Sequence, residues 1–133
     1  MGRRRGEWPA EPEPLPAPVI DNHTHLESIS DVLDDGVPDP GVAGHLERGA
    51  AAGVEAVVQI GCDLDTAEVS VRWAHEYPSM VAGVAIHPNE AVLHAGVREV
   101  APDGLEPAPA PRHETLLEDA IARIAELARD PRV

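Results

Sequence analysis

Short apolar runs recur along the chain and predict strands. The three runs are Val19–Ile20, Val54–Ile60 and Met80–Ile86, and each is bounded by proline, glycine or polar residues, as strands are. None of them alternates cleanly between apolar and polar residues. That pattern predicts strands covered on both faces, as in parallel sheets.

Helical patterns separate and follow these runs. A first helix is predicted to begin at Asp39–Pro40, because Asp caps helices and Pro suits their first position. Asp65 and Glu68 have the spacing of a capping box for a second helix, and Thr115 and Glu118 have it for a third. The apolar stripe of the third helix consists of Leu116, Leu117, Ala120, Ile121, Ile124, Leu127 and Ala128.

The resulting order is βαβαβ, then a loop and a helix, which predicts an α/β fold. Right-handed crossovers would make the sheet parallel, either open and doubly wound or closed into a barrel. We expect the lone Val133 after the last helix to mark the beginning of a fourth strand. Residues 1–18 are proline-rich and predict an extended tail outside the fold, and residues 101–112 predict a proline-rich loop.

Composition narrows the class of partner and the compartment. The formal net charge of −14 is the opposite of the basic footprint of nucleic-acid binding, so metal ions would have to supply positive charge if nucleic acid is handled. No run approaches the roughly 20 apolar residues of a membrane span. The single Cys62 excludes an internal disulfide framework, and the basic start at residues 1–5 lacks a following apolar stretch. We therefore expect a cytoplasmic protein that does not contact membranes.

Polar side chains follow the first apolar run directly. Asp21, His23 and His25 occupy alternate positions, so an extended backbone would aim all three to one side. Two imidazoles that converge in this way can share a divalent ion, and Asp21 could be a ligand or the outer partner that fixes a tautomer. The alternative is a polar turn with two solvated histidines, in a chain that has seven.

The hypothesis of a metal site also includes His87, which lies at the end of another predicted strand. It ends the third apolar run, immediately before Pro88, and would lie on the same rim as His23 and His25. Ligands of parallel sheets bind at the carboxyl ends of the strands. A rim histidine with a purely structural role is the alternative for His87.

Three segments together resemble the TatD family of deoxyribonucleases. Val19–Leu26 is similar to the family's first strand, a hydrophobic pair followed by Asp-x-His-x-His-Leu. Ala52–Leu64 resembles its second strand and following loop, and Ala85–Glu90 resembles its third strand end. Ala85 departs from the pattern, because the family generally has Gly there.

The resemblance implies a fold and a set of site residues. Residues 19–133 would be the N-terminal part of a TIM-type (β/α)8 barrel, truncated before its fourth strand. The family takes further ligands from the fourth, fifth, sixth and eighth strands, which this chain lacks. His23 and His25 would therefore be metal ligands, His87 a site residue of open role and Asp21 an outer partner.

The resemblance also implies an activity. The complete enzyme would bind two divalent ions, which would be Mg, Mn or Zn. It would use them to activate a water molecule that cleaves phosphodiester bonds in DNA. The chain alone would be inactive, and its exposed barrel edge would favour self-association. Two alternatives stay open: a hydrolase of small amides or esters on the same barrel, and a non-catalytic α/β binding domain.

Overall fold

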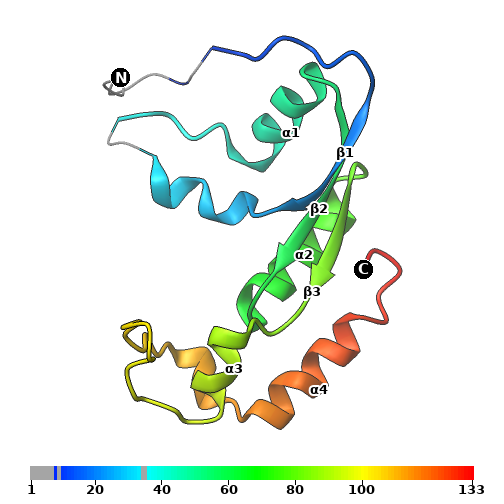
Figure 1. Cartoon of the computed structure of the whole chain (residues 1–133). Coiled ribbons are helices and arrows are strands. Elements are labelled where there is room, and N and C mark those ends of the chain that lie inside the picture. Colours follow the sequence, from blue (N-terminus) through cyan, green and yellow to red (C-terminus); the bar gives the residue numbers. More distant parts are fainter. Residues whose placement is uncertain (1–7, 9, 34–35) are drawn as a thin grey trace.

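A parallel three-stranded sheet forms the centre of the molecule (Figure 1). The computed structural model describes residues 8, 10–33 and 36–133. The strands are β1 (Val19–Thr24), β2 (Val54–Gly61) and β3 (Met80–Val84), in the order β1-β2-β3. Both pairings are parallel, and the β1–β2 register is irregular between residues 21 and 24. The predicted α/β fold with a parallel sheet is confirmed.

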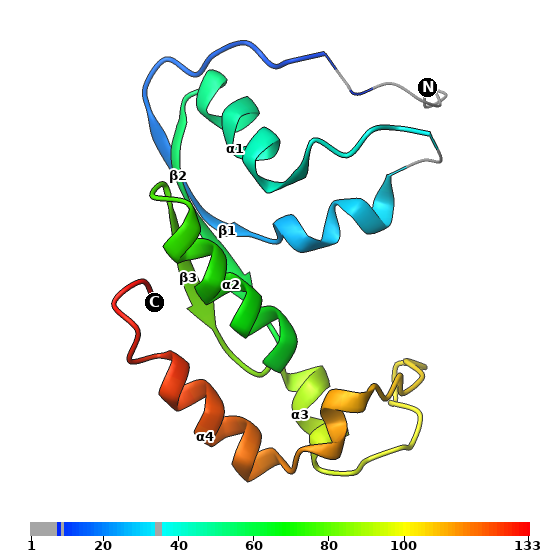
Figure 2. The ribbon, with the colours of Figure 1, turned by 180° about the vertical axis from the view of Figure 1, so that it is seen from behind.

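Helices alternate with these strands and continue after them. They are α1 (Gly41–Ala51), α2 (Leu64–Glu76), α3 (Pro88–His94) and α4 (Leu117–Leu127), with short 3-10 helices η1 (Leu26–Ser28), η2 (Ser30–Val32) and η3 (Pro111–Glu114). Front and rear views place α1 and α2 on the same face of the sheet (Figures 1 and 2). Consecutive strand order with crossovers on one face is consistent with part of a barrel, whereas doubly wound sheets carry helices on both faces.

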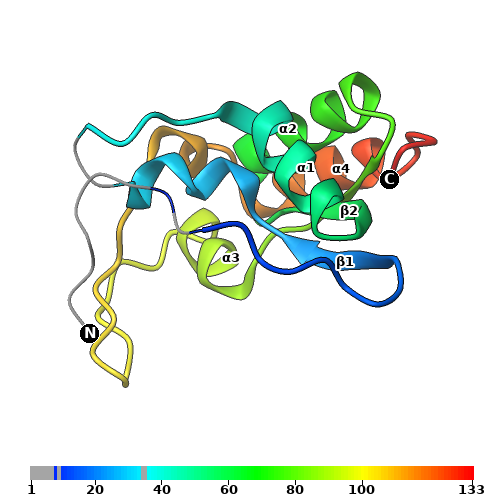
Figure 3. The same cartoon turned by 90° about the horizontal axis from the view of Figure 1, so that it is seen from above.

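The main cluster of buried apolar residues lies between the sheet and this helical layer. Its buried residues are Val57, Val71, Ala74, Met80 and Ala82. On the opposite face Val81 is 42% exposed and Ile20 is 64% exposed, and the view from above shows α1, α2 and α4 on the same side of β1 and β2 (Figure 3). The prediction that both faces are covered is therefore wrong for the described residues, because the crossovers all pass on one side.

All three helix starts differ from the predicted caps. In α1 the N-cap is Pro40 and not Asp39, although Asp39 Oδ1 accepts from the Gly41 N–H at 2.8 Å. The capping box of α2 uses Asp63 and Thr66, because Asp63 Oδ1 accepts from the Thr66 N–H at 2.8 Å. The Asp65 and Glu68 pair is therefore not the cap. In α4 the N-cap is Leu116, without a side-chain hydrogen bond, so the predicted Thr115 box is also wrong. Most of the predicted α4 stripe is not buried: Ala120 is buried and Leu127 is partly buried against the core, whereas Leu116 and Ile121 are exposed.

Gly61 brings α2 close to the end of β2. A Cβ atom at Gly61 would lie 2.3 Å from the Cα of Ala67, far inside van der Waals contact. Only glycine allows this approach, which sets the first turn of α2 and its cap Asp63 against the carboxyl end of the sheet.

The segment after α4 returns to the sheet beside β3. The Ala82 N–H donates to the carbonyl of Arg132 at 2.8 Å, the kind of bond that a neighbouring strand makes. The Arg132 guanidinium donates to the carbonyls of Ala74, Pro78 and Met80. Residues 128–133 form turns, without an assigned strand.

The predicted tail and loop contain little regular structure. Residues 10–18 are exposed and have no helix or strand, although the Leu15 N–H donates to the Ala52 carbonyl at 2.9 Å. Residues 1–7 and 9 lie outside the described residues. Residues 95–110 form turns and extended chain. Among the helices of the described part of the chain, none has the length and apolar character that crossing a membrane requires.

Candidate metal centre

His23 and His25 face each other at the carboxyl end of β1. His23 lies within the strand, and His25 directly follows its last residue as the N-cap of η1. Their Nε2 atoms are 3.2 Å apart and their ring centroids 5.0 Å apart. The convergence that the alternate spacing predicts is thus present in the structure.

The spacing of the two nitrogens fits a shared divalent ion. An ion about 2.1 Å from each Nε2, the usual distance for imidazole ligands, would see the two nitrogens at an angle of about 100°. That angle lies between tetrahedral and octahedral values. His23 is exposed, and the His25 side chain is 35% exposed, so further ligands can approach from solvent. The geometry of the pair therefore suits an ion, but the pair supplies only two of the ligands that such an ion needs.

Glu27 lies behind His25. Its Oε1 is 3.4 Å from the His25 Nδ1, an arrangement that favours hydrogen on Nδ1 and leaves the Nε2 lone pair facing His23. Gln59 of β2 in turn contacts Glu27, because its Nε2 donates to Glu27 Oε2. Its Oε1 accepts from the Leu26 N–H at 2.9 Å. Neither Glu27 nor Gln59 was predicted as a site residue.

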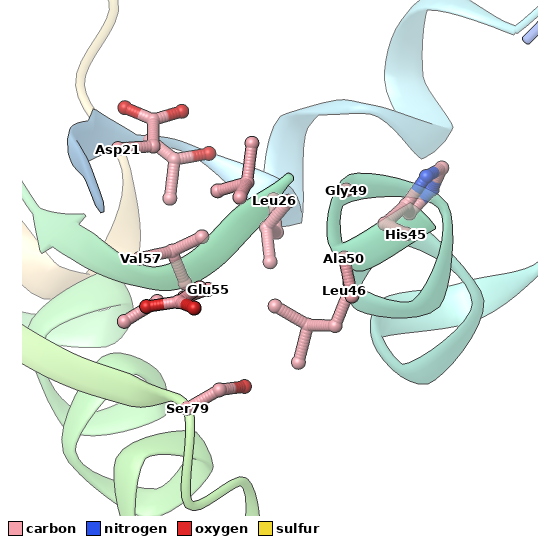
Figure 4. A pocket seen from close by; sticks show the side chains of 12 residues that line it. Asp21, Leu26, His45, Leu46, Gly49, Ala50, Glu55, Val57 and Ser79 are labelled. Atoms are coloured by element: carbon pink, nitrogen blue, oxygen red, sulfur yellow. The ribbon is translucent and has the colours of Figure 1, made fainter. Parts of the chain in front are cut away.

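Asp21 contacts the backbone of the pair. Its Oδ1 accepts from the His23 N–H at 3.1 Å, and no hydrogen bond from Asp21 to either ring occurs among the described residues. Asp21 also lies at the edge of a small pocket of about 170 Å³ between the sheet and α1 (Figure 4). Leu26, Leu46 and Val57 line that pocket together with the polar residues His45, Glu55 and Ser79.

His87 caps a helix that the sequence analysis missed. β3 ends at Val84, so His87 does not end the strand; it is the N-cap of α3, and its Nδ1 accepts from the Asn89 N–H at 3.2 Å. Its own N–H donates to the Cys62 carbonyl at 2.7 Å, which places His87 beside the end of β2. No hydrogen bond, ion pair or ring contact joins it to the histidine pair in the described residues. Pro88 in the first helical position was the overlooked signal.

A second histidine and carboxylate group lies between α3 and η3. Ligand atoms of Glu90, His94 and His113 lie within 4.8 Å of one another and could hold a metal ion. The His94 Nδ1 donates to the Thr115 carbonyl at 2.8 Å. The His113 Nδ1 accepts from the Ala110 N–H at 2.8 Å, so its Nε2 carries the hydrogen that goes to Glu90 at 2.7 Å.

Arg112 completes this second group, which consists of Glu90, His94, Arg112 and His113 and is called the closed group below. Its guanidinium donates to both carboxylate oxygens of Glu90, at 2.8 and 3.2 Å, and lies 3.6 Å from Asp63. The hydrogen bond from Arg112, followed by that from His113, holds the pKa of Glu90 below its ordinary value. An ion at this position would have to displace a guanidinium and a ring hydrogen. Only the His94 Nε2, which is buried and has no hydrogen-bond partner among the described residues, is ready to bind.

Cys62 lies at the same rim, directly after β2. Burial, followed by the negative charge of Glu27 and Asp63, raises the pKa of its thiol. The protonated thiol is a poor nucleophile. Among the polar side chains at the carboxyl ends of the strands, the imidazoles and carboxylates are therefore better candidates for chemistry than this thiol.

Comparison with known proteins identifies relatives of this sequence. A family model described as TatD related DNase matches residues 20–133. A protein of Mycobacterium tuberculosis (strain ATCC 25618 / H37Rv), described as an uncharacterized metal-dependent hydrolase TatD, is 39% identical over 74 residues. That match covers 55% of this chain and 26% of the relative, so the chain aligns with about a quarter of the relative's length. Since the family model covers most of the chain and includes the histidine pair, the chain belongs to the TatD-related DNase family.

Proposed function

We propose that His23 and His25 are metal ligands of a divalent-metal-dependent hydrolase of the TatD type. The observation that carries the proposal is the 3.2 Å separation of two Nε2 atoms at the carboxyl end of a parallel strand, the location of ligand sites in barrel enzymes. We further propose that the three strands are the first of a (β/α)8 barrel. The consecutive strand order and the coverage of one face by α1 and α2 support this.

The proposed reaction is hydrolysis of phosphodiester bonds in DNA. The complete enzyme would hold two divalent ions, each of them Mg, Mn or Zn. These ions would supply Lewis-acid charge for the scissile phosphate and the attacking water. In this chain His23 and His25 would present their Nε2 atoms to the ion, with Glu27 behind His25. With a net charge of −14, the chain does not attract a polyanion by itself, so the ion would also make the substrate's approach favourable.

A hydrolase of small amides or esters on the same barrel is the second candidate. The observation that favours it is the same net charge of −14, because a small neutral substrate meets no repulsion. Barrel scaffolds accept such changes of substrate through their loops.

Metal binding tests the shared part of both candidates. Isothermal titration with Mn²⁺ or Zn²⁺ should give one site in this chain, and His23→Ala should remove it. Unchanged binding by that variant would exclude the histidine pair as the ligand set. His45→Ala is the control, because His45 lies on α1 and outside the pair.

Substrate assays separate the two candidates. We expect no significant cleavage of a DNA oligonucleotide by this chain alone, since two ligands leave most coordination positions to water. A homologue with all barrel strands should cleave DNA if the first candidate holds. Cleavage of esters or amides without cleavage of DNA would favour the second.

The uncovered sheet face is the proposed site of self-association, through the exposed side chains of Ile20 and Val81. Apolar surface of this kind favours association. Size-exclusion chromatography with light scattering should detect dimers or larger species, and a single monomeric species would contradict this proposal.

A further inference from the structure

The side chain of Gln59 is buried in the middle of β2, yet it is a primary amide among apolar neighbours. Its exposed fraction is 0%, and a buried amide is stabilised only when its donors and acceptor find partners. Gln59 pairs in register with Thr24, at the end of β1. Its partners are both in the segment that follows His25: the Leu26 N–H and the carboxylate of Glu27.

Those partners fix the orientation of the amide and of the carboxylate. A backbone N–H can only donate, so the amide oxygen must face Leu26 and the amide nitrogen must face Glu27. One carboxylate oxygen of Glu27 is thereby occupied, and the other, Oε1, lies 3.4 Å from the His25 Nδ1. The Glu27 side chain is 24% exposed, so it is partly shielded from competing water.

We propose that Glu27 and Gln59 are positioning residues for the histidine pair. Glu27 keeps hydrogen on the His25 Nδ1, so that the Nε2 lone pair faces His23, and Gln59 holds the Glu27 carboxylate in place. This inference rests on the proposed function of the pair as metal ligands. It adds a carboxylate behind one ligand and an amide behind the carboxylate, both reaching the pair from the helix-covered side of the sheet.

The position of Gln59 shields its hydrogen bonds from solvent. β2 is the central strand and Gln59 lies on its buried face, so water does not compete for the amide. In the metal-free protein the His23 Nε2 hydrogen can then be donated to the His25 Nε2, in agreement with their 3.2 Å separation. An ion held by both Nε2 atoms would take the place of that hydrogen, and the His23 ring would then carry its proton on Nδ1 instead.

Nitrogen-15 NMR of the histidine rings tests the positioning role directly, with or without metal. In the unaltered chain His25 should be mainly the Nδ1–H tautomer. In Glu27→Ala that preference should be lost, while far-UV circular dichroism stays unchanged. Asp31→Asn is the matched control, since it removes a nearby exposed negative charge and should leave the tautomer unaltered. An unchanged His25 tautomer in Glu27→Ala would overturn the proposal.

Titration of the same proteins with Co²⁺ supplies the second readout. Removing an outer partner of a ligand typically weakens metal affinity about 10- to 100-fold, and we expect Glu27→Ala and Gln59→Leu to fall in that range, with Asp31→Asn unaffected. If the unaltered chain binds Co²⁺ and Glu27→Ala binds it equally well, the positioning role fails and the metal site stands. If no protein binds Co²⁺, the proposed function fails, and the tautomer measurement still decides the positioning role.

Discussion

The histidine pair at the end of β1 and the cluster between α3 and η3 both combine histidines with carboxylates, and they differ in what occupies their nitrogen and oxygen atoms. At the end of β1, the Nε2 atoms of His23 and His25 face each other and are accessible to solvent, and Glu27 lies behind the His25 ring. Between α3 and η3, the carboxylate of Glu90 is already bound by a guanidinium and by a ring N–H. The comparison teaches that groups with the same residue types can differ in their access to solvent and in the number of hydrogen bonds that an ion would have to replace.

The largest expected effect separates the two groups by metal affinity. His25→Ala removes one of the two proposed ligands and should weaken Co²⁺ binding by about 100-fold or more, beyond the effect of losing an outer partner. His94→Gln, in the closed group, should leave the affinity unchanged. The reverse result in a Co²⁺ titration would show that the closed group is the metal site.

Removing the guanidinium should destabilise the closed group. Arg112→Ala deletes two charge-assisted hydrogen bonds to Glu90 and the contact with Asp63, and its side chain is only 22% exposed. We expect the free energy of unfolding to fall by about 2 kcal/mol, measured by urea denaturation. Arg72→Ala on the exposed side of α2 is the control, and a loss of similar size there would remove the special role of Arg112.

The closed group should also make stability depend on acid. The pKa of Glu90 is lowered in the folded chain, chiefly by Arg112, so its ionised form is favoured by folding. Its contribution is complete above the ordinary glutamate pKa and is lost as the pH falls from there through the lowered value. Thermal melts from neutral pH to about pH 3 should therefore show a smaller acid-induced decline in Glu90→Gln than in the unaltered chain. Equal slopes would contradict this assignment.

The smallest expected effect concerns Cys62, which lies between the two groups. Because burial and neighbouring negative charges raise the pKa of its thiol, little thiolate exists at neutral pH. Iodoacetamide should therefore modify Cys62 more slowly than it modifies an unstructured cysteine peptide at the same pH. Faster modification than that of the peptide would mean that the rim is more electropositive than these contacts indicate.

Sequence patterns predicted the sheet and the histidine pair but not the surroundings of the pair. Alternate spacing suffices for His23 and His25, since extended backbone places them on one side. Gln59 was hidden within the run Val54–Ile60, where it was treated as part of an apolar strand. A buried amide that needs partners was the available signal, but its partners, Leu26 and Glu27, lie more than 30 positions away.

Other errors came from competition between local signals. The run Met80–Ile86 looks like one strand, yet β3 ends at Val84, because Pro88 begins a helix with His87 as its cap. Asp65 and Glu68 have capping-box spacing, but Asp63 lies nearer the end of β2 and takes that role. Coverage of the sheet could not be read from apolar runs, because it depends on which side the crossovers pass.

The close approach at Gly61 has a consequence for which sequences this rim can tolerate. Carbon atoms pack at about 3.5–4.0 Å, so even alanine there would displace the first turn of α2 by roughly an ångström. Gly83 differs, because its added Cβ would meet only the flexible end of Ile60 at 2.8 Å. In a library randomised at both positions, glycine alone should survive selection for folding at 61, while alanine should be recovered at 83. A single hydrogen atom in place of a methyl group thus limits the variation open to the loop from which Asp63 reaches Arg112.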